Sequence, residues 1–253
     1  MLIEQFICRI DNIAILLHHE SSQRTIAIDA PDGEALLAHL QKLERKLDLV
    51  LITHHHTDHT SGIRVIKEKT NALFIGPEAE KSKIFGLDYV INEHDILQTD
   101  FCNIEVLSTP GHTLGSISYY FPEEKLIFTG DTLFSLGCGR IFEGSTKMMF
   151  HSLEKLASIP EDTRMYCGHE YTEKNGQFAL TVDPQNKNLQ DHVAKIISLR
   201  KKNRLTMPST IGLERAINPF LRSANPSIRK NLDLMTASDE RVFATLRKLK
   251  DNY

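Results

Sequence analysis

Short apolar runs bounded by turn residues recur through the first two thirds of the chain. Runs of about four to eight residues, rich in Val, Ile, Leu and Phe and flanked by Gly, Pro, Asn or Asp, are typical of β-strands. We therefore predict a strand at each of these places. The runs are "IAILLHH" (13–19), "TIAIDA" (25–30), "DLVLIT" (48–53), "ALFIG" (72–76), "NIEVLSTP" (103–110), "SISYYF" (116–121), "KLIFTGD" (125–131) and "TRMYCG" (163–168).

Helical patterns lie between some of these strands. The segments "GEALLAHLQKLERK" (33–46), "GIRVIKEKT" (62–70) and "TKMMFHSLEKLASI" (146–159) repeat apolar residues at spacings of three and four. Such spacing indicates one buried face of a helix. Strands with inserted helices predict an α/β domain built in layers.

The pattern changes after "CGHEYT". The segments "KNLQDHVAKIISLRKKNRL" (187–205), "NPSIRKNLDLM" (225–235) and "SDERVFATLRKLK" (238–250) predict helices, and we expect no strand among them. We predict a domain over residues 1–172 and a helical subdomain over residues 173–253.

The overall composition is that of a globular protein, with 253 residues of which 41% are hydrophobic and 25% charged. No apolar run reaches the roughly 18 residues of a membrane span, and the first residues lack the pattern of a signal peptide. The cysteines are scattered without C-x-x-C spacing, which favours reduced thiols; they are Cys8, Cys102, Cys138 and Cys167. We expect a cytoplasmic protein.

Charge is distributed unevenly along the chain. Residues 1–194 hold 17 Lys/Arg against 28 Asp/Glu, whereas residues 195–253 hold 13 against 5, so a net charge of −11 is followed by +8. A basic terminal section indicates an anionic partner, either nucleic acid or a small carboxylated molecule. A solvated helix face is the simpler alternative.

The stretch "LITHHHTDHTSG" places imidazole and carboxylate groups directly after a predicted buried strand. If the chain leaves that strand extended, His54 and His56 point to one side and His55 to the other. Asp58 and His59 follow around the turn. This density of nitrogen and carboxylate ligands suits zinc, iron or manganese.

Three further predicted strands end in a possible metal ligand, at His112, Asp131 and His169. With the first cluster these make seven candidate ligands, whereas one open tetrahedral site needs only about four. Seven ligands predict two metals that share one ligand, and a carboxylate can bridge because it has two oxygens. Two metals about 3.5–4 Å apart hold a hydroxide and polarise the group it attacks, which indicates metal-assisted hydrolysis.

Four segments carry a family resemblance: "THHHTDHTSG", "STPGHTLGS", "FTGDTLFSLGCGRIFEG" and "CGHEYT". In this order they resemble the metallo-β-lactamase superfamily, and specifically the hydroxyacylglutathione hydrolases (glyoxalase II). The later "MPSTIGLERAINPFLR" and "LRKLKDNY" are similar to the glutathione-binding helical part of that family. The resemblance implies a four-layer αββα sandwich followed by a helical C-terminal subdomain.

The same resemblance implies roles for the seven candidate ligands and a pair of divalent metals, with zinc foremost and iron or manganese as alternatives. His54, His56 and His112 would hold one metal, and Asp58, His59 and His169 the other, with Asp131 as the bridge. Asp58 and Asp131 would be the catalytic carboxylates. Members of the lactamase branch have cysteine where this chain has Asp131.

The implied reaction is hydrolysis of S-(2-hydroxyacyl)glutathione, typically S-D-lactoylglutathione, to D-lactate and glutathione in methylglyoxal detoxification. The resemblance implies substrate contacts from a small set of residues, namely Arg140, Phe142, Tyr171, Arg247 and Lys250. Their partner would be a small glutathione thioester, and we expect a monomer that binds neither nucleic acid nor a membrane.

The spacing of Arg247 and Lys250 puts both on one helix face, and Ser238 followed by two acids is a good start for that helix. Relatives commonly carry a tyrosine where this chain has Phe142, and many have "DNY" where this chain has "DNI" with Ile13. These differences concern substrate contact rather than metal chemistry.

Two other enzyme classes remain open at this point. A nuclease of the same superfamily would use the basic C-terminal section on phosphates, although such enzymes usually need an added clamping domain. A glutathione-persulfide dioxygenase with one iron shares the first histidine motif. A non-catalytic binding module has no need for an open dinuclear site.

Overall fold

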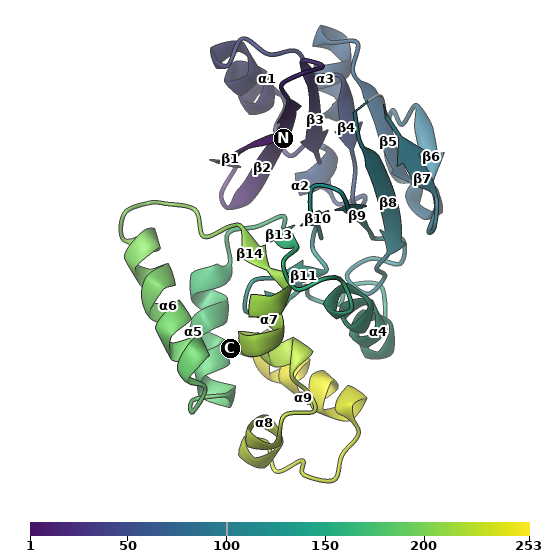
Figure 1. Cartoon of the computed structure of the whole chain (residues 1–253). Coiled ribbons are helices and arrows are strands. Elements are labelled where there is room, and N and C mark those ends of the chain that lie inside the picture. The colour runs from purple at the N-terminus through teal and green to yellow at the C-terminus, as the bar shows by residue number, and fades with distance from the viewer. Residues whose placement is uncertain (100) are drawn as a thin grey trace. The chain divides into compact units, whose positions relative to one another are not determined.

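The computed structural model describes residues 1–99 and 101–253, and its contacts divide the chain into two compact units. Unit 1 comprises residues 1–108 and 113–130, and unit 2 comprises residues 109–112 and 131–253. The chain passes from one unit to the other three times, after Ser108, His112 and Gly130. Figure 1 follows the course of the chain by colour.

A six-stranded sheet organises the first part of unit 1 and runs in the order β1-β2-β3-β4-β5-β6. Strands β1, β2 and β3 pair antiparallel, and β3 to β6 pair parallel. Strands β3, β4 and β5 read as continuous apolar runs because both faces of this part of the sheet are buried, whereas the edge strand β6 is mostly exposed. The strands are β1 (Leu2–Cys8), β2 (Asn12–His19), β3 (Arg24–Ile28), β4 (Leu49–Leu51), β5 (Leu73–Pro77) and β6 (Tyr89–Ile91).

Helices α1 (Gly33–Lys42) and α3 (Ile63–Lys69) pack side by side on one face of this sheet. Leu36 of α1 and Ile66 of α3 share a buried cluster with Phe74 of β5. The short helix α2 (Thr57–Thr60) follows β4, and the 3₁₀ turn η1 (Glu78–Glu80) follows β5.

A second sheet of unit 1 lies against the opposite face of the first. Buried Tyr119 of this sheet donates its hydroxyl to the carbonyl of Ile52, at 2.8 Å. Unit 1 is therefore layered as helices, sheet and sheet. The strands pair antiparallel in the order β7 (Ile96–Gln98), β8 (Asn103–Ser108), β9 (Ile117–Phe121) and β10 (Leu126–Phe128).

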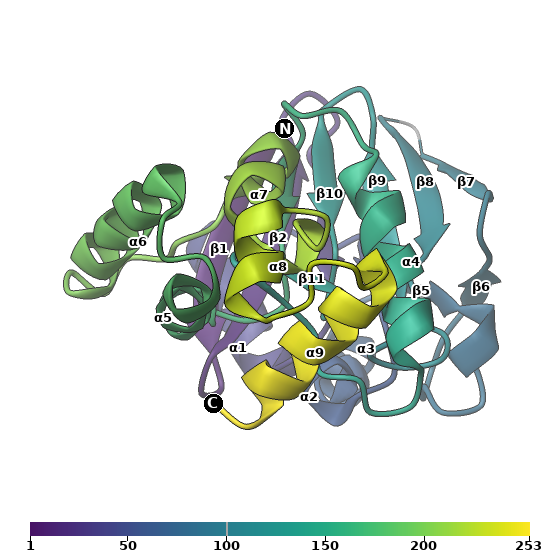
Figure 2. The same cartoon turned by 90° about the horizontal axis from the view of Figure 1, so that it is seen from below.

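Unit 2 is mainly helical. Its two short strand pairs are β11 (Leu133–Phe134) with β12 (Gly137–Cys138), and β13 (Arg164–Tyr166) with β14 (Ser209–Thr210). Helix α4 runs beside α9, and α5 beside α6 (Figure 2). The helices are α4 (Thr146–Ala157), α5 (Thr172–Val182), α6 (Lys187–Arg200), α7 (Ile211–Ile217), η2 (Pro219–Leu221), α8 (Pro226–Asn231) and α9 (Asp239–Asp251).

The structure confirms all eight predicted strands and the predicted start of α9, where the Ser238 side chain accepts from the Arg241 N–H. The prediction of no strand in the C-terminal part is wrong. β14 is only two residues long, too short to leave a periodic pattern, and it exists because β13 offers a pairing edge.

Three predicted helices are shorter than their apolar pattern indicated. The helices expected over 33–46, 187–205 and 225–235 end at Lys42, Arg200 and Asn231. Glu44, Asn203 and Asp233, just beyond these ends, have φ of 55°, 53° and 55°. Left-handed backbone there stops each helix although the residue types favour continuing it.

Across the described residues, no helix combines the length and apolar character needed to cross a membrane.

A buried carboxylate connects separate segments of unit 2. Glu214 of α7 accepts hydrogen bonds from Ser135 Oγ at 2.7 Å, Leu136 N at 2.8 Å and Asn218 Nδ2 at 3.0 Å. Ser209 of β14 also donates to it. Burial raises the pKa of Glu214, and these donors oppose that shift. The carboxylate thereby fixes the loop that follows Asp131.

We expect Glu214→Ala to lower the free energy of unfolding by about 3 kcal/mol or more, because each buried donor left without its acceptor costs about 1–3 kcal/mol. Urea unfolding measures the change. Glu161→Ala, which removes an exposed partner of Arg215, is the matched control and should stay within about 0.5 kcal/mol. Equal, small effects in both variants would contradict the connecting role of Glu214.

Candidate metal centre

Three imidazole rings of unit 1 gather where the loop after β4 runs into α2: His54 and His56 lie in the loop, and His59 lies in α2. The ring centroids of His54 and His56 lie 4.8 Å apart, and those of His54 and His59 lie 4.2 Å apart. His54 and His59 are buried. The Nδ1 atom of His55 instead lies 2.9 Å from a carboxylate oxygen of Glu80. The His55 ring therefore has the Glu80 carboxylate as its partner, which agrees with the alternation of side chains along an extended chain.

One carboxylate orients two of these histidines. Asp29 Oδ2 accepts from His59 Nδ1 at 2.8 Å and from Thr53 Oγ1 at 2.9 Å. Because the Thr53 hydroxyl donates to Asp29, its oxygen accepts the 3.0 Å hydrogen bond from His54 Nδ1. Both rings therefore turn Nε2 toward any metal. Partners of this kind fix the tautomer of ligand histidines and raise their basicity.

Asp29 occupies an unusual backbone conformation directly after β3. Its φ is 58°, in the left-handed region that Asp tolerates better than most residues. Its Oδ1 also accepts from the Thr53 backbone N–H at 2.7 Å. The sequence contained a signal for this residue, because Asp29 ends an apolar strand as Asp131 does, but our sequence analysis did not single it out.

Asp58 is the more exposed carboxylate of the unit 1 group, with 38% of its side chain accessible. Its Oδ2 lies 3.7 Å from His59 Nε2 and accepts from Asn12 Nδ2 at 3.1 Å. Asn12, which the sequence analysis also missed, donates to the Asp58 carbonyl as well. Residue 12 precedes Ile13, so the "DNI" variation lies next to the residue that positions Asp58.

Unit 2 brings together the three remaining candidate ligands. Asp131 Oδ2 lies 3.5 Å from His112 Nε2 and 3.3 Å from His169 Nε2. Two ligands held about 2.0–2.1 Å from one tetrahedral ion are separated by about 3.3 Å. His112 Nδ1 donates to the Arg140 carbonyl at 2.7 Å, which leaves Nε2 for a metal. The two histidine Nε2 atoms and Asp131 Oδ2 therefore have the chemistry and spacing of metal ligands, and both nitrogens lie near the same carboxylate oxygen.

Two aromatic rings lie beside these imidazoles. The Phe142 ring meets His112 edge-on with centroids 5.2 Å apart, and 61% of Phe142 is exposed. The Tyr171 ring stacks on His169 at 4.7 Å. Both residues thus offer apolar surface next to candidate ligands of unit 2.

Three predicted substrate-binding cations lie near the end of α9. Arg140 Nε lies 3.3 Å from Asp251 Oδ1, and Arg247 Nη2 lies 3.0 Å from the same oxygen. Arg247 is only 6% exposed and donates to the Cys138 carbonyl at 2.8 Å. Arg140 is half exposed. Arg247 is therefore buried and supports the loop that carries Arg140.

Lys250 lies partly buried beside that group. Its Nζ donates to the Lys174 carbonyl at 3.2 Å and lies over the rings of Phe178 and Tyr253. Burial, with the nearby charges of Arg247 and Lys174, lowers the pKa of Lys250 to about 8.

The two cysteines near the motifs are free and buried, which indicates packing residues. Cys138 and Cys167 are buried, and burial raises the pKa of both thiols. A raised pKa disfavours the nucleophilic thiolate.

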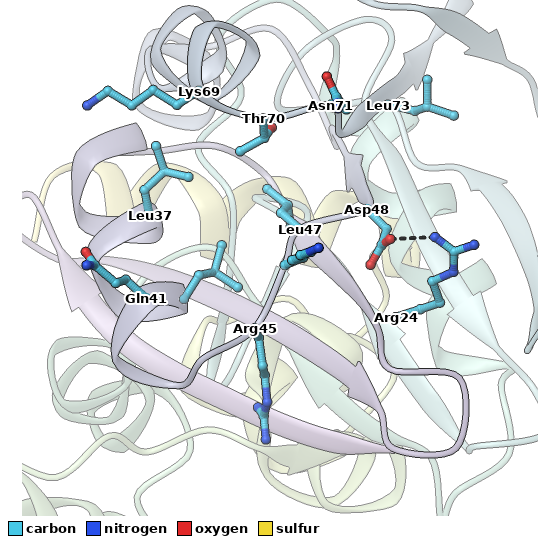
Figure 3. A pocket seen from close by; sticks show the side chains of 12 residues that line it. Arg24, Leu37, Gln41, Arg45, Leu47, Asp48, Lys69, Thr70, Asn71 and Leu73 are labelled. Carbon is cyan, nitrogen blue, oxygen red and sulfur yellow. Dashed lines mark hydrogen bonds and ion pairs between the residues drawn. The ribbon is translucent and has the colours of Figure 1, made fainter.

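A cavity of about 650 Å³ in unit 1 is separate from all of these residues (Figure 3). It is lined partly by cations, but Arg24 pairs with Asp48 and Lys69 pairs with Glu34. None of the seven candidate ligands lines it.

Comparison with known proteins gives matches over both parts of the chain. A family model described as "Metallo-beta-lactamase superfamily" matches residues 22–169, and one described as "Hydroxyacylglutathione hydrolase C-terminus" matches residues 170–253. The chain is 52% identical over 253 residues to the hydroxyacylglutathione hydrolase of Bartonella tribocorum, covering 100% of both. It is 53% identical over 251 residues to that of Brucella abortus, covering 99% of this chain and 98% of the relative.

Solved structures of lower identity share the fold. ETHE1 from Myxococcus xanthus gives a TM-score of 0.70 at 24% identity, covering 98% of this chain and 91% of that one. BLEG-1 B3 metallo-beta-lactamase gives 0.68 at 22% identity, covering 87% and 100%. These likenesses confirm the αββα fold implied by the sequence motifs. Together with the His/Asp groups, the superfamily match supports binding of divalent metal ions.

We expect His55→Ala to retain the metal content of the unmodified protein, because the His55 ring is engaged with Glu80. His54→Ala should lose metal, since its Nε2 is the oriented nitrogen. Elemental analysis of both dialysed variants measures this difference. A loss in His55→Ala as large as that in His54→Ala would show that the ring of His55 is itself a ligand.

Proposed function

The chain belongs to the hydroxyacylglutathione hydrolases of the metallo-β-lactamase superfamily, and from this premise we propose that it hydrolyses S-(2-hydroxyacyl)glutathione. The substrate is S-D-lactoylglutathione and the products are D-lactate and glutathione, a step of methylglyoxal detoxification. The observation that carries this proposal is the single oxygen of Asp131 placed 3.3–3.5 Å from two histidine Nε2 atoms.

The proposed site holds two divalent metals, with zinc foremost. His54, His56 and His112 would hold one ion, Asp58, His59 and His169 would hold the other, and Asp131 would be shared by both. Chain connectivity supports this assignment, because two of the three passages between units fall directly after His112 and directly before Asp131. Gly130 must also pass close to the His54 loop: a Cβ there would lie 2.7 Å from Thr53 Oγ1, and its φ is 48°.

When bound, the two metals supply a hydroxide at neutral pH and polarise the carbonyl that it attacks. The chain's own residues provide the preorganisation. Asp29 locks the tautomers of His54 and His59, and the Arg140 carbonyl locks that of His112. Asn12 holds Asp58 in place. These groups need no rearrangement as charge develops on the substrate, which is the main electrostatic advantage of an enzyme site.

The reaction consumes one water. A C–O bond forms at the thioester carbon, the C–S bond breaks, and the electron pair of that bond leaves with glutathione sulfur. The thiolate of a thiol with a pKa of about 8.5 is a good leaving group, so no side-chain acid has to protonate the sulfur first. The 2-hydroxy acid ionises at neutral pH and releases one proton. The buried Cys138 and Cys167 take no part.

The glutathione part is bound by unit 2 in this proposal. Phe142 and Tyr171 give apolar surface beside the ligand imidazoles, and Arg140 and Lys250 offer positive charge to a glutathione carboxylate. Arg247 pairs with the same Asp251 carboxylate as Arg140, so it helps to offset the negative charge beside Arg140 in the proposed glutathione subsite. This use of the basic C-terminal section is favoured over nucleic-acid binding because Arg140, which shares Asp251 with Arg247, lies 6.0 Å from the Phe142 ring beside the candidate ligand His112.

The domain division at residue 172 stays part of the proposal, with residues 1–172 catalytic and 173–253 helical and glutathione-binding. Family models that match 22–169 and 170–253 support it. We propose a cytoplasmic monomer without nucleic-acid or membrane partners. Four free, buried cysteines are consistent with a reducing compartment.

We expect purified protein with two bound metals to hydrolyse S-D-lactoylglutathione, and Asp131→Ala to lose most activity and both metals, because one oxygen serves both ions. Loss of thioester absorbance and elemental analysis on one sample measure both effects. Full activity and metal content in Asp131→Ala would rule out the bridge. Oxygen consumption with one iron per chain, or RNA cleavage without thioester hydrolysis, would replace the proposed reaction with one of the alternatives.

We expect KM for the thioester to rise by up to about tenfold between pH 7 and pH 9 while kcat changes little. Lys250, with a pKa of about 8, loses its charge over this range and with it the attraction to a carboxylate. Lys250→Arg, which stays charged, should abolish the rise. A rise of the same size in Lys250→Arg would place the titrating group elsewhere.

A further inference from the structure

Glu80 is a buried carboxylate to which the proposed mechanism gives no role. It lies at the end of η1 and is 1% exposed. Its Oε2 accepts from the His55 backbone N–H at 2.6 Å and lies 2.9 Å from His55 Nδ1. Its Oε1 accepts from Thr113 Oγ1 at 2.5 Å and from the Gly115 N–H at 3.0 Å. Each carboxylate oxygen thus binds a different segment of unit 1.

The two segments are the ones that flank a single set of candidate ligands. His55 stands between His54 and His56, and Thr113 is the residue directly after His112. The fit around Glu80 is close, because a Cβ at Gly115 would lie 2.5 Å from Glu80 Cγ. The spacing between these two segments is therefore fixed by the length of one buried side chain.

A charged acceptor is better suited to this position than a neutral one. The groups that hydrogen-bond to Glu80 are the N–H groups of residues 55 and 115 and the Thr113 hydroxyl, and a carboxylate has about four acceptor sites and no hydrogen to donate. Hydrogen bonds to an ionised acceptor are roughly twice as strong as neutral ones. An amide would turn an NH₂ group toward one of these donors.

We propose that Glu80 is a positioning residue for one metal of the pair, the ion assigned to His54, His56 and His112. It acts by holding the backbone of residue 55 and the start of the 113–115 segment at the separation that this ion requires. The inference rests on the proposed ligand assignment. It also implies selectivity, because the hydrogen bonds of Glu80 reach the segments around this first set and not Asp58 or His59.

The test compares Glu80→Gln with Glu78→Gln, the same substitution on the exposed side of the same 3₁₀ turn. Apoprotein is titrated with Zn²⁺ against a chromophoric chelator, which resolves the affinity of each ion. Glu80→Gln should weaken one ion about 10–100-fold, the range typical of partners that orient ligands, and change the other by less than about threefold. Glu78→Gln should match the unmodified protein for both ions.

Thr113→Val, which removes one donor to Glu80 and nearly conserves volume, keeps the test open if Glu80→Gln does not fold. It should weaken the same ion by a smaller factor. Both ions bound as in Glu78→Gln, even with a lowered melting temperature, would overturn the positioning role and leave the proposed function standing. Failure of the unmodified protein to bind two ions would instead overturn the ligand assignment and this inference with it.

Discussion

The interaction on which the site most depends is the set of hydrogen bonds to the Asp29 carboxylate. It accepts from His59, from the hydroxyl of Thr53 and from the Thr53 backbone, and Thr53 passes the orientation on to His54. A metal ligand must present its lone pair in a fixed direction, and a histidine on a loop cannot do so alone. Asp29 supplies that direction because β3 and the strand before the histidine loop are parallel neighbours whose ends meet.

In unit 2, a different set of groups orients the candidate ligands. Asp131 stands between His112 and His169, and the Arg140 carbonyl fixes the His112 ring. The loop that supplies this carbonyl is held by Arg247, while Glu214 anchors the segment just after Asp131. These buried polar groups thus fix the positions of the candidate ligands. Removing one of them leaves its buried hydrogen-bond partner without an acceptor or donor, which lowers the free energy of unfolding.

Sequence reasoning predicted eight of the fourteen strands among the described residues and nominated the seven candidate ligands, because both rest on local patterns; it missed the short or edge strands β1, β6, β7, β11, β12 and β14. Alternation along an extended chain was enough to separate His55 from its neighbours, and a cap followed by acids was enough to start α9. It failed where the outcome depends on residues distant in sequence. Glu80 lies in an ordinary acidic turn, β14 forms only against partners 44–46 residues earlier, and Arg247 is buried by contacts that helical spacing cannot reveal.

Whether two metals share Asp131 can be seen directly in a crystal structure of the metal-loaded protein with anomalous scattering recorded at the metal edge. We expect two peaks about 3.5–4 Å apart, with one Asp131 carboxylate in contact with both. A single peak, or two peaks that do not share Asp131, would contradict this expectation.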